Sequence, residues 1–400
     1  MADKFVFSMW TYNDIKEFTP DEVDVWADCG LNIPMGPGVS PDNAAAYIPF
    51  LDRAQERGIK LIANVYGIDY GTLLKIGEEE YEARIRKVID AIGGHPALHG
   101  LCVGDEPSTL RNMEASKKCI EINKKVAPHL TPYLNYMGGT ICAEGEALGG
   151  RDLKGWFKYV ADETGTTELC YDDYGPAINE RSKGSFMKSA YNVAKAASYA
   201  GCDAWGCLLS SAHHVYHKQR EVDALWQINA SAALGLRGVL WFRFYDKLGV
   251  YTYKDSPIDE FGNKTELYYG LMRSQRRFSY HFGEVFPKLD LKKVYAVKSD
   301  KGIFPEFRPG EHDLIKDIKT NDETIVSFFE DEKGDEYLCL FHTVTEWYGV
   351  VELDYDSEKC ELCYVRENGK NLSPIGHEAE DEEQLMILPA SIELLKIVRK

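Results

Sequence analysis

Short apolar runs alternate with amphipathic stretches over the first 290 residues of the chain. Each run is rich in β-forming residues, and each interval between two runs is long enough for a helix. This order predicts parallel strands that are connected by helices. The eight predicted strands are residues 4–10, 30–35, 59–66, 97–104, 132–137, 168–174, 202–210 and 237–245.

Three of the intervals carry clear helix signals. Residues 19–30 begin at a threonine, continue with acidic residues and end at Gly30. Residues 76–92 and 218–235 have apolar positions at helical spacing. Eight strand–helix units in about 285 residues predict an α/β fold, a (β/α)8 TIM barrel over residues 1–290. A doubly wound open sheet is the alternative, but no glycine-rich phosphate-binding turn follows the first strand.

The pattern changes after residue 290, where short strands are joined by hairpin turns. Lys333-Gly334 and Asn368-Gly369 each separate two alternating runs, as in two-stranded hairpins. We therefore expect residues 291–400 to form a C-terminal antiparallel β-sandwich domain packed on the barrel. A chain of 400 residues exceeds the usual size of one hydrophobic core, which favours two domains.

The composition narrows the choice of partners and of cellular location. A net charge of −18 repels phosphate backbones, so nucleic acid is not expected as a partner. No apolar stretch is long enough for a membrane span, and residues 1–10 lack the features of a signal peptide. The ten cysteines have no framework spacing, which is typical of reduced thiols in the cytoplasm. The Cys360–Cys363 pair lacks the further ligands of a zinc site.

Candidate chemistry is sought at the C-terminal ends of the strands, where barrel enzymes hold their active sites. Carboxylates, aromatic rings, amides and hydroxyls occur there together. Sugars need flat faces to stack on and fixed polar groups for their hydroxyls, so this combination predicts a carbohydrate substrate. The candidate residues are Trp10, Tyr12, Asp105, Glu106, Asn135, Tyr171, Asp172, Asp173, Tyr174, His213, Trp241 and Arg243.

The segment Gly-Asp-Glu-Pro at 104–107 is the sharpest local signal. Pro107 ends the ladder of the fourth strand and leaves the two carboxylates on the rim. Glycosidic cleavage requires a carboxylic acid that protonates the departing oxygen. Glu106 suits this role, and Asp105 can orient it and raise its pKa. Capping of the following helix is the alternative role for both residues.

The second carboxylate of a glycosidase is expected from the sixth strand. Asp172 and Asp173 are adjacent, and neighbours in an extended segment face opposite sides. We choose Asp172 as base or nucleophile and keep Asp173 as the second choice. Both could instead be loop acids that face water.

The remaining candidates are assigned to binding rather than to proton transfer. Trp10, Tyr174 and Trp241 are expected to form stacking walls. Asn135 and His213 are expected to bind hydroxyls, and Tyr12, Tyr171 and Arg243 complete the substrate-binding set.

A metal is the alternative role for the histidines, since His213 and His217 are four residues apart and could share a helical face. Zinc needs at least three ligands, usually with a carboxylate or cysteine among them, so hydrogen bonding to substrate or placement on the surface is favoured for these histidines. No cofactor and no metal are expected.

Six segments follow one another between residues 97 and 289: GDEP, YLNYM, the YDxYP-like YDDYG, CDAWGCLLSS, ALGLRGVLWFRFY and DEFGNKTELYYGLMRS. Together they resemble the motifs of a group of bacterial glycoside-hydrolase-like proteins, distantly akin to the β-galactosidase type of the large barrel glycosidase clan. The resemblance implies a barrel, sugar substrates and Glu106 as acid/base.

The chain departs from this group at two positions. In the large glycosidase clan the nucleophile is a glutamate at the end of the seventh strand, whereas this strand ends in Leu208-Leu209-Ser210. The proline of the YDxYP-like motif is also displaced, because Gly175 precedes Pro176. Four explanations remain for the missing glutamate. Asp172 or Asp173 acts instead, water attacks directly, an acetamido group of the substrate attacks, or hydrolysis has been lost.

The predicted function is therefore hydrolysis of a glycosidic bond in an oligosaccharide or small glycoside. Two alternatives stay open. The first is a non-catalytic carbohydrate-binding protein on a hydrolase fold, which the missing glutamate favours. The second is a metal-dependent sugar isomerase or lyase, which a metal at His213 and His217 would favour.

Overall fold

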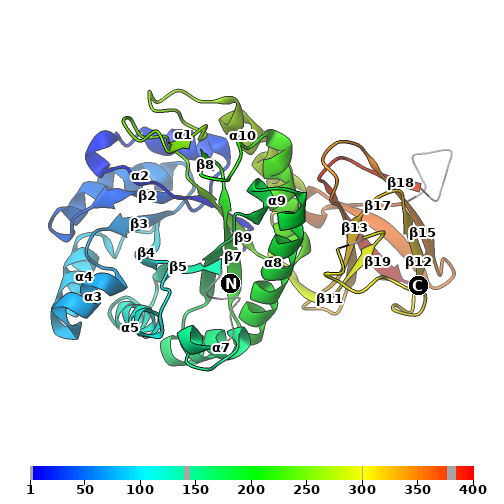
Figure 1. Ribbon diagram of the computed structural model, residues 1–400, viewed down its shortest axis with the longest axis horizontal. Helices are drawn as coiled ribbons and strands as arrows, with labels where there is room; N and C mark the ends of the chain where they lie inside the picture. The colour runs from blue at the N-terminus through cyan, green and yellow to red at the C-terminus, as the bar shows by residue number, and fades with distance from the viewer. Residues whose placement is uncertain (1–2, 139–144, 300, 376–383) are drawn as a thin grey trace.

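Eight parallel strands form a closed barrel at the N-terminal side of the molecule (Figure 1). The computed structural model describes residues 3–138, 145–299, 301–375 and 384–400. Around the sheet the strands follow in the order β1-β9-β7-β6-β5-β4-β3-β2. The backbone N–H groups of Asn32 and Ile33 donate hydrogen bonds to the carbonyl of Phe7, at 3.0 and 3.2 Å, and these bonds close the barrel between β2 and β1. The strands are β1 (Val6–Met9), β2 (Met35–Val39), β3 (Leu61–Val65), β4 (Leu98–Asp105), β5 (Thr131–Met137), β6 (Glu168–Asp172), β7 (Asp203–Leu209) and β9 (Gly238–Phe242).

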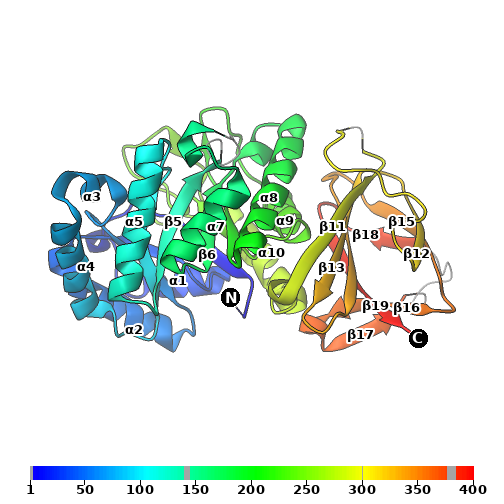
Figure 2. The same cartoon turned by 90° about the horizontal axis from the view of Figure 1, so that it is seen from below.

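Helices surround the sheet on its outer face (Figure 2). They are α1 (Glu22–Cys29), α2 (Ile48–Glu56), α3 (Tyr70–Ile76), α4 (Glu78–Ile92), α5 (Leu110–Val126), α7 (Leu153–Thr164), α8 (Glu180–Ala200), α9 (Glu221–Ala233) and α10 (Glu266–Phe282). Short 3-10 helices occur in the connections at Ile15–Glu17, Pro41–Tyr47, Glu146–Leu148, Gly175–Ala177, Phe286–Lys288 and Glu367–Gly369. Within the described part of the chain, no helix is both long enough and apolar enough to cross a bilayer.

The second strand lies later in the chain than the sequence pattern predicts. Residues 30–35 were the expected strand, but β2 begins only at Met35. The preceding segment is a loop because the Asn32 side chain binds the backbone of β1, accepting from Phe7 and donating to the carbonyl of Phe5 at 2.8 Å each. Within β2, a Cβ at Gly36 would lie 2.8 Å from the ring of Tyr47. The strand therefore uses glycine for close packing, which the apolar pattern did not reveal.

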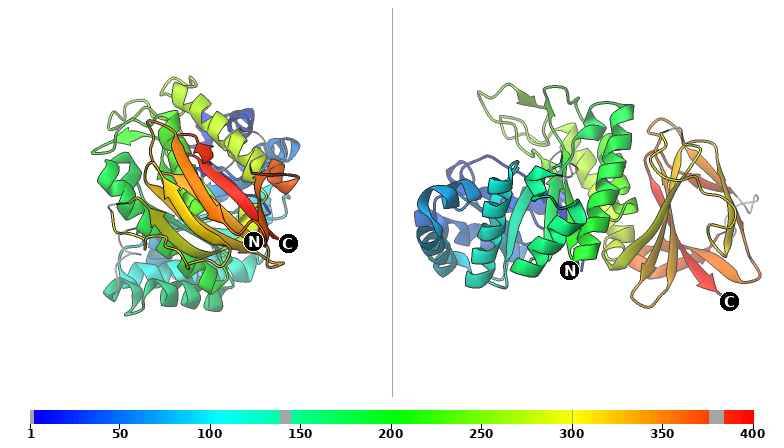
Figure 3. Two further views of the ribbon diagram at one scale, coloured as in Figure 1. Left: turned by 90° about the vertical axis from the view of Figure 1, so that its right-hand side faces the viewer. Right: turned by 60° about the horizontal axis from the view of Figure 1, so that its bottom comes forward.

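The C-terminal part is an antiparallel β-sandwich, as predicted (Figure 3). One sheet has the order β11-β13-β14-β19-β16-β17 and the other β12-β15-β18. Both predicted hairpins are present, because β13 pairs with β14 and β16 pairs with β17. The strands are β11 (Leu289–Val297), β12 (Ile315–Thr320), β13 (Thr324–Asp331), β14 (Glu336–His342), β15 (Gly349–Tyr355), β16 (Cys360–Arg366), β17 (Asn371–Pro374), β18 (Gln384–Ile387) and β19 (Ile392–Arg399).

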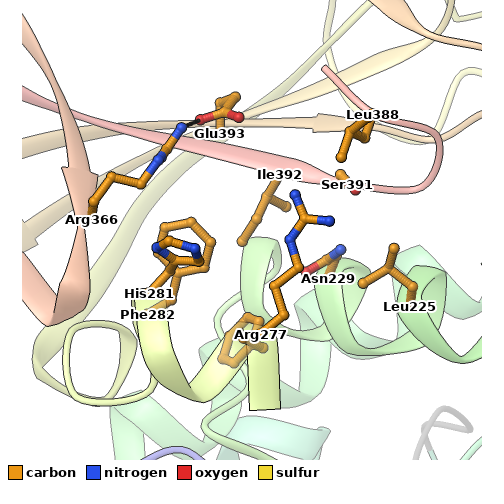
Figure 4. A pocket seen from close by; sticks show the side chains of 11 residues that line it. Leu225, Asn229, Arg277, His281, Phe282, Arg366, Leu388, Ser391, Ile392 and Glu393 are labelled. Atoms are coloured by element: carbon orange, nitrogen blue, oxygen red, sulfur yellow. Dashed lines mark hydrogen bonds and ion pairs between the residues drawn. The ribbon is translucent and has the colours of Figure 1, made fainter. Parts of the chain in front are cut away.

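Buried side chains fix the sandwich against helices α9 and α10. Trp226 donates from Nε1 to the carbonyl of Thr343 at 2.8 Å, and its ring lies 5.6 Å from that of Phe341. Asn229 donates to the carbonyl of Ala390 at 2.8 Å. A small cavity of about 70 Å³ remains at this contact, and Figure 4 shows the side chains that line it. These contacts make the sandwich a support of the barrel wall rather than a freely tethered module.

Candidate active site

The side chains at the barrel end divide according to the alternation of each strand. One set points inward and forms a cluster inside the barrel, and the other set packs against the surrounding helices. The inward set brings together residues from five strands or strand ends that are distant in the sequence: Trp10, Asn135, Asp172, Cys207 and Phe242.

Glu106 and Asp172 form a hydrogen-bonded carboxyl pair at the ends of β4 and β6. Asp172 is 6% exposed and also accepts from the backbone N–H of Gly138 at 3.0 Å. Burial raises the pKa of Asp172 to about 9, together with the hydrogen bond that Asp172 donates to Glu106 and the negative charge of Glu106, although the Gly138 N–H lowers it. Two carboxyl groups that share a hydrogen bond hold a proton between them. Glu106 is the more exposed of the two.

Asp105 is held beside this pair from two sides. The Asn135 side chain donates to its Oδ1 at 3.0 Å, and Tyr70 donates to its carbonyl at 3.0 Å. Burial raises the pKa of Asp105 to about 6; the Asn135 bond lowers it and the charge of Glu106 raises it. The backbone of Glu106 has φ 45° and donates to the carbonyl of Asn135 at 2.8 Å.

Asp173 does not join the carboxyl pair. Its carboxylate accepts from the N–H of Gly175 at 2.9 Å and is hydrogen-bonded to Ser189 of α8. Burial raises the pKa of Asp173, and these two bonds lower it. Of the two adjacent aspartates, only Asp172 lies against Glu106.

Aromatic rings line the end of the barrel next to the carboxyl pair. Tyr174 stacks on Phe242, with ring centroids 5.5 Å apart and planes at 22°. The ring of Tyr12 lies 6.0 Å from Phe242 and 6.0 Å from Trp10, and Tyr12 is 48% exposed. A half-exposed ring beside fixed carboxyls offers an apolar face to a sugar.

Two predicted binding residues lie on the helix side of the sheet instead. Trp241 is fully buried and donates from Nε1 to Oε1 of Gln275 on α10 at 3.1 Å. Tyr171 is also fully buried, in the cluster that the strands share with the helices. Their neighbours Phe242 and Asp172 point to the inside.

A small hairpin over the barrel end carries His213. Strand β8 (Ala212–His213) pairs with β10 (Tyr253–Lys254), and the ring of His213 lies 4.5 Å from Tyr253 and 4.8 Å from Tyr216. Burial lowers the pKa of His213. Arg243, which follows β9, places its guanidinium 4.8 Å from the centroid of Tyr253 and is 4% exposed.

The described residues contain one group with the spacing of metal ligands, and it lies in the sandwich: His312, Asp313 and Glu336. Arg399 already donates to both carboxylates of this group. His213 and His217 join no third ligand among the residues that the structure describes. The nine described cysteines are free and buried, Cys360 and Cys363 among them.

The sequence analysis missed several residues of this site. Phe242 could have been found from the alternation of β9, but its neighbour Trp241 carries the stronger aromatic signal. Tyr70 belongs to helix α3, Tyr253 to the short strand β10 and Tyr216 to a connection. Their placement depends on tertiary structure, so no local pattern indicates them.

The sequence itself matches no family model and no curated protein. The fold matches solved structures that are glycoside hydrolases. A β-galactosidase from Rahnella sp. R3 matches with a TM-score of 0.53 and 11% identity over 73% of this chain. An endo-β-1,4-mannanase from Thermotoga petrophila matches with a TM-score of 0.50 and 11% identity over 96% of this chain and 97% of the mannanase.

In fold, this chain is similar to the barrel glycoside hydrolases. A third match, the β-galactosidase of the haloarchaeon Halorubrum lacusprofundi, has a TM-score of 0.50 and 11% identity over 69% of this chain. The chain spans 58% of the length of each of the two β-galactosidases. At such identities the likeness concerns the fold, so the chemistry must be argued from the site.

Proposed function

We propose that the protein is a glycoside hydrolase in which Glu106 is the general acid/base and Asp172 the second carboxylate. The observation that carries this proposal is the hydrogen-bonded pair of these two residues, with the pKa of Asp172 raised to about 9. A carboxyl that stays protonated near neutral pH is what protonation of a glycosidic oxygen requires.

In this pair the proton lies on Asp172, within hydrogen-bonding distance of Glu106. Asp172 is enclosed, whereas Glu106 is exposed at the strand ends and is the group that a substrate meets. Transfer of the proton along the hydrogen bond gives a protonated Glu106 and an ionised Asp172. Glu106 then protonates the leaving oxygen, and Asp172 acts as base or nucleophile.

Substrate must separate the two groups before reaction. Hydrogen-bonded carboxyls are closer than the about 5–5.5 Å of retaining enzymes or the about 6.5–9.5 Å of inverting enzymes. Glu106 is the partner with room to move, since Asp172 is tied to the Gly138 N–H. Separation also removes the contact with Glu106 that raises the pKa of Asp172, which favours its ionised form.

The end of β7 supports Asp172 over a residue on that strand. Leu209 points into the barrel and Ser210 donates to the carbonyl of Arg243 at 3.0 Å, so neither offers a carboxylate. We therefore assign the second carboxylate to β6, with Asp105 orienting the pair. Tyr12, Tyr174 and Phe242 supply the faces on which the sugar stacks.

Sugar release from a panel of glycosides and oligosaccharides, measured for wild type and Glu106→Gln, tests the proposal. We expect wild type to hydrolyse at least one member and Glu106→Gln to lose about 10²-fold or more in kcat, the scale of a lost general acid. Asp172→Asn is expected to lose a similar factor.

Glu79→Gln is the matched control, because Glu79 is exposed on α4 and carries the same charge. It should hydrolyse like wild type. Equal turnover by Glu106→Gln and Glu79→Gln would contradict the assignment. Sugar binding without release from any substrate would instead favour the carbohydrate-binding alternative.

A further inference from the structure

The guanidinium of Arg243 is a buried cation, and two of its three nitrogens have no hydrogen-bond partner in the described part of the protein. Arg243 is 4% exposed, and its Nε and Nη2 are both enclosed and unpaired. An arginine offers five donors, and burying them unused costs about 1–3 kcal/mol for each unsatisfied group. Such an arrangement lowers the stability of the fold, so these unpaired donors point to a ligand that would pair with them.

The surrounding side chains compensate the charge only in part. Asp246 is close enough to act on Arg243 electrostatically, but its carboxylate is bound by the hydroxyl of Ser256 at 2.5 Å and by the Ser256 N–H. Tyr253 contributes a ring face at 4.8 Å, which attracts the cation without using its N–H groups. Nε and Nη2 of the guanidinium therefore remain unpaired.

This cation lies at the proposed catalytic end of the barrel. A row of aromatic rings connects the two features, because the rings of Tyr12 and Tyr253 each lie 6.0 Å from that of Phe242. The guanidinium of Arg243 lies 4.8 Å from the centroid of Tyr253, at the far end of this row from Tyr12. Arg243 is therefore a cation that a sugar stacked on Tyr12 and Phe242 can meet.

We propose that the substrate is an acidic sugar, and that Arg243 binds the carboxylate of a uronic acid residue. This inference rests on the proposed hydrolase function, whose site it extends. A planar guanidinium matches a planar carboxylate through two parallel N–H···O bonds, and a neutral sugar would leave the cation unpaired. Because Nε and Nη2 are enclosed, the proposal requires the side chains that cover them to move when a carboxylate binds, and Tyr253 on the two-residue strand β10 lies against this guanidinium.

Because the chain has a strongly negative net charge, binding of an anionic sugar depends on a local cation such as Arg243. At −18 the protein repels an anionic sugar at long range. A site for such a sugar therefore needs a positive group that is shielded from solvent and counterions, where its attraction is strong. Arg243 meets this condition because it is buried.

Two measurements on the full chain test the proposal. The first is calorimetric binding of glucuronate, galacturonate, glucose, galactose and galactose 6-sulfate. The second is hydrolysis of nitrophenyl uronides and of the matching neutral glycosides, in both anomers. We expect wild type to prefer the uronates about tenfold or more in binding and the uronides in kcat/KM. Arg243→Gln should reduce the uronide rate about 10²-fold or more and bring the ratio to the neutral glycoside near one.

Arg308→Gln is the matched control, since Arg308 is exposed in the sandwich and this substitution removes the same charge as Arg243→Gln. It should keep the uronide preference, and Arg243→Lys should keep part of it, because it retains the charge without the planar fork. If Arg243→Gln does not fold, the preference of wild type and of Arg243→Lys for uronates over neutral sugars still tests the proposal.

A wild-type preference for neutral sugars, binding of no sugar, or equal losses for charged and neutral substrates in Arg243→Gln would overturn the proposal. Stronger binding of the sulfated sugar than of the uronates would overturn the assignment of a carboxylate. Uronate binding that depends on Arg243, without hydrolysis of any glycoside, would uphold this inference and reject the hydrolase function.

Discussion

Asp172 holds a proton in the folded protein at pH values where an unfolded aspartate has lost it. Its folded pKa is about 9, against about 3.9 in an unfolded chain. Between these values the folded state binds more protons than the unfolded state. Stability from this group is therefore complete below about pH 4 and is lost as the pH rises toward 9. Above that value Asp172 contributes a buried charge.

Replacing Asp172 with asparagine removes this pH dependence. We expect Asp172→Asn to be more stable than wild type at pH 8, and the difference to grow with pH by about 1.4 kcal/mol per unit at most. Denaturant unfolding at pH 5 to 9 measures it. Asp162→Asn, on the surface of α7, is the control and should follow wild type. A constant difference across this range would mean that Asp172 titrates normally.

At the scale of elements, two adjacent aromatic residues of strand β9 pack on opposite faces of the sheet. Trp241 packs between the sheet and α10, whereas Phe242 points inward and stacks with Tyr174. The sequence analysis proposed Trp241 as a stacking wall. The structure places Phe242 inside the barrel and Trp241 on the helix side, so the effect of changing Trp241 is expected in stability.

Trp241→Phe tests this division. The substitution keeps an aromatic ring but leaves the buried Oε1 of Gln275 without its donor, so we expect a loss of about 1–3 kcal/mol in the free energy of unfolding. Trp347→Phe, at a 52% exposed position of the sandwich, should change stability by less than about 0.5 kcal/mol. Equal effects of the two substitutions would contradict the buried role of Trp241.

The fold could be predicted because its strands carry their own signals. Seven of the eight barrel strands overlap the predicted runs closely, and both hairpin turns are marked by Lys333-Gly334 and Asn368-Gly369. Strand β2 was misplaced because its glycines serve packing against Tyr47 and Tyr66 rather than an apolar pattern. An element whose position depends on packing against residues distant in the sequence is hard to predict from its local sequence.

The candidate site could be predicted only as a set of strand ends. The C-terminal ends of β4 and β6 put Glu106 and Asp172 in one region, and the structure brings them into contact. The sequence could not indicate that they share a hydrogen bond or that Arg243 lies unpaired, because both facts depend on packing between distant segments.

At the scale of the molecule, the barrel and the sandwich share a buried contact. Trp226 and Asn229 of α9 bond to the backbone of the sandwich, and Phe286 packs against Phe329 with ring centroids 5.7 Å apart. Separating the two parts would expose these aromatic rings and leave buried polar groups unpaired. The two parts are thus expected to unfold together.

Differential scanning calorimetry of the full chain tests this coupling. We expect one transition, with calorimetric and van't Hoff enthalpies that agree. A chain ending at residue 288 should lose solubility, because Trp226 and Phe286 become exposed. Two resolved transitions in the full chain, together with a soluble truncated barrel, would show that the parts are independent.

The backbone of Glu106 separates the needs of the fold from those of the proposed chemistry. Its φ of 45° belongs to the left-handed region, where a residue other than glycine or asparagine costs about 1–3 kcal/mol. Glycine would adopt this conformation without that cost. The fold alone therefore does not favour a glutamate at this position, which agrees with a role of its side chain as the proposed acid/base.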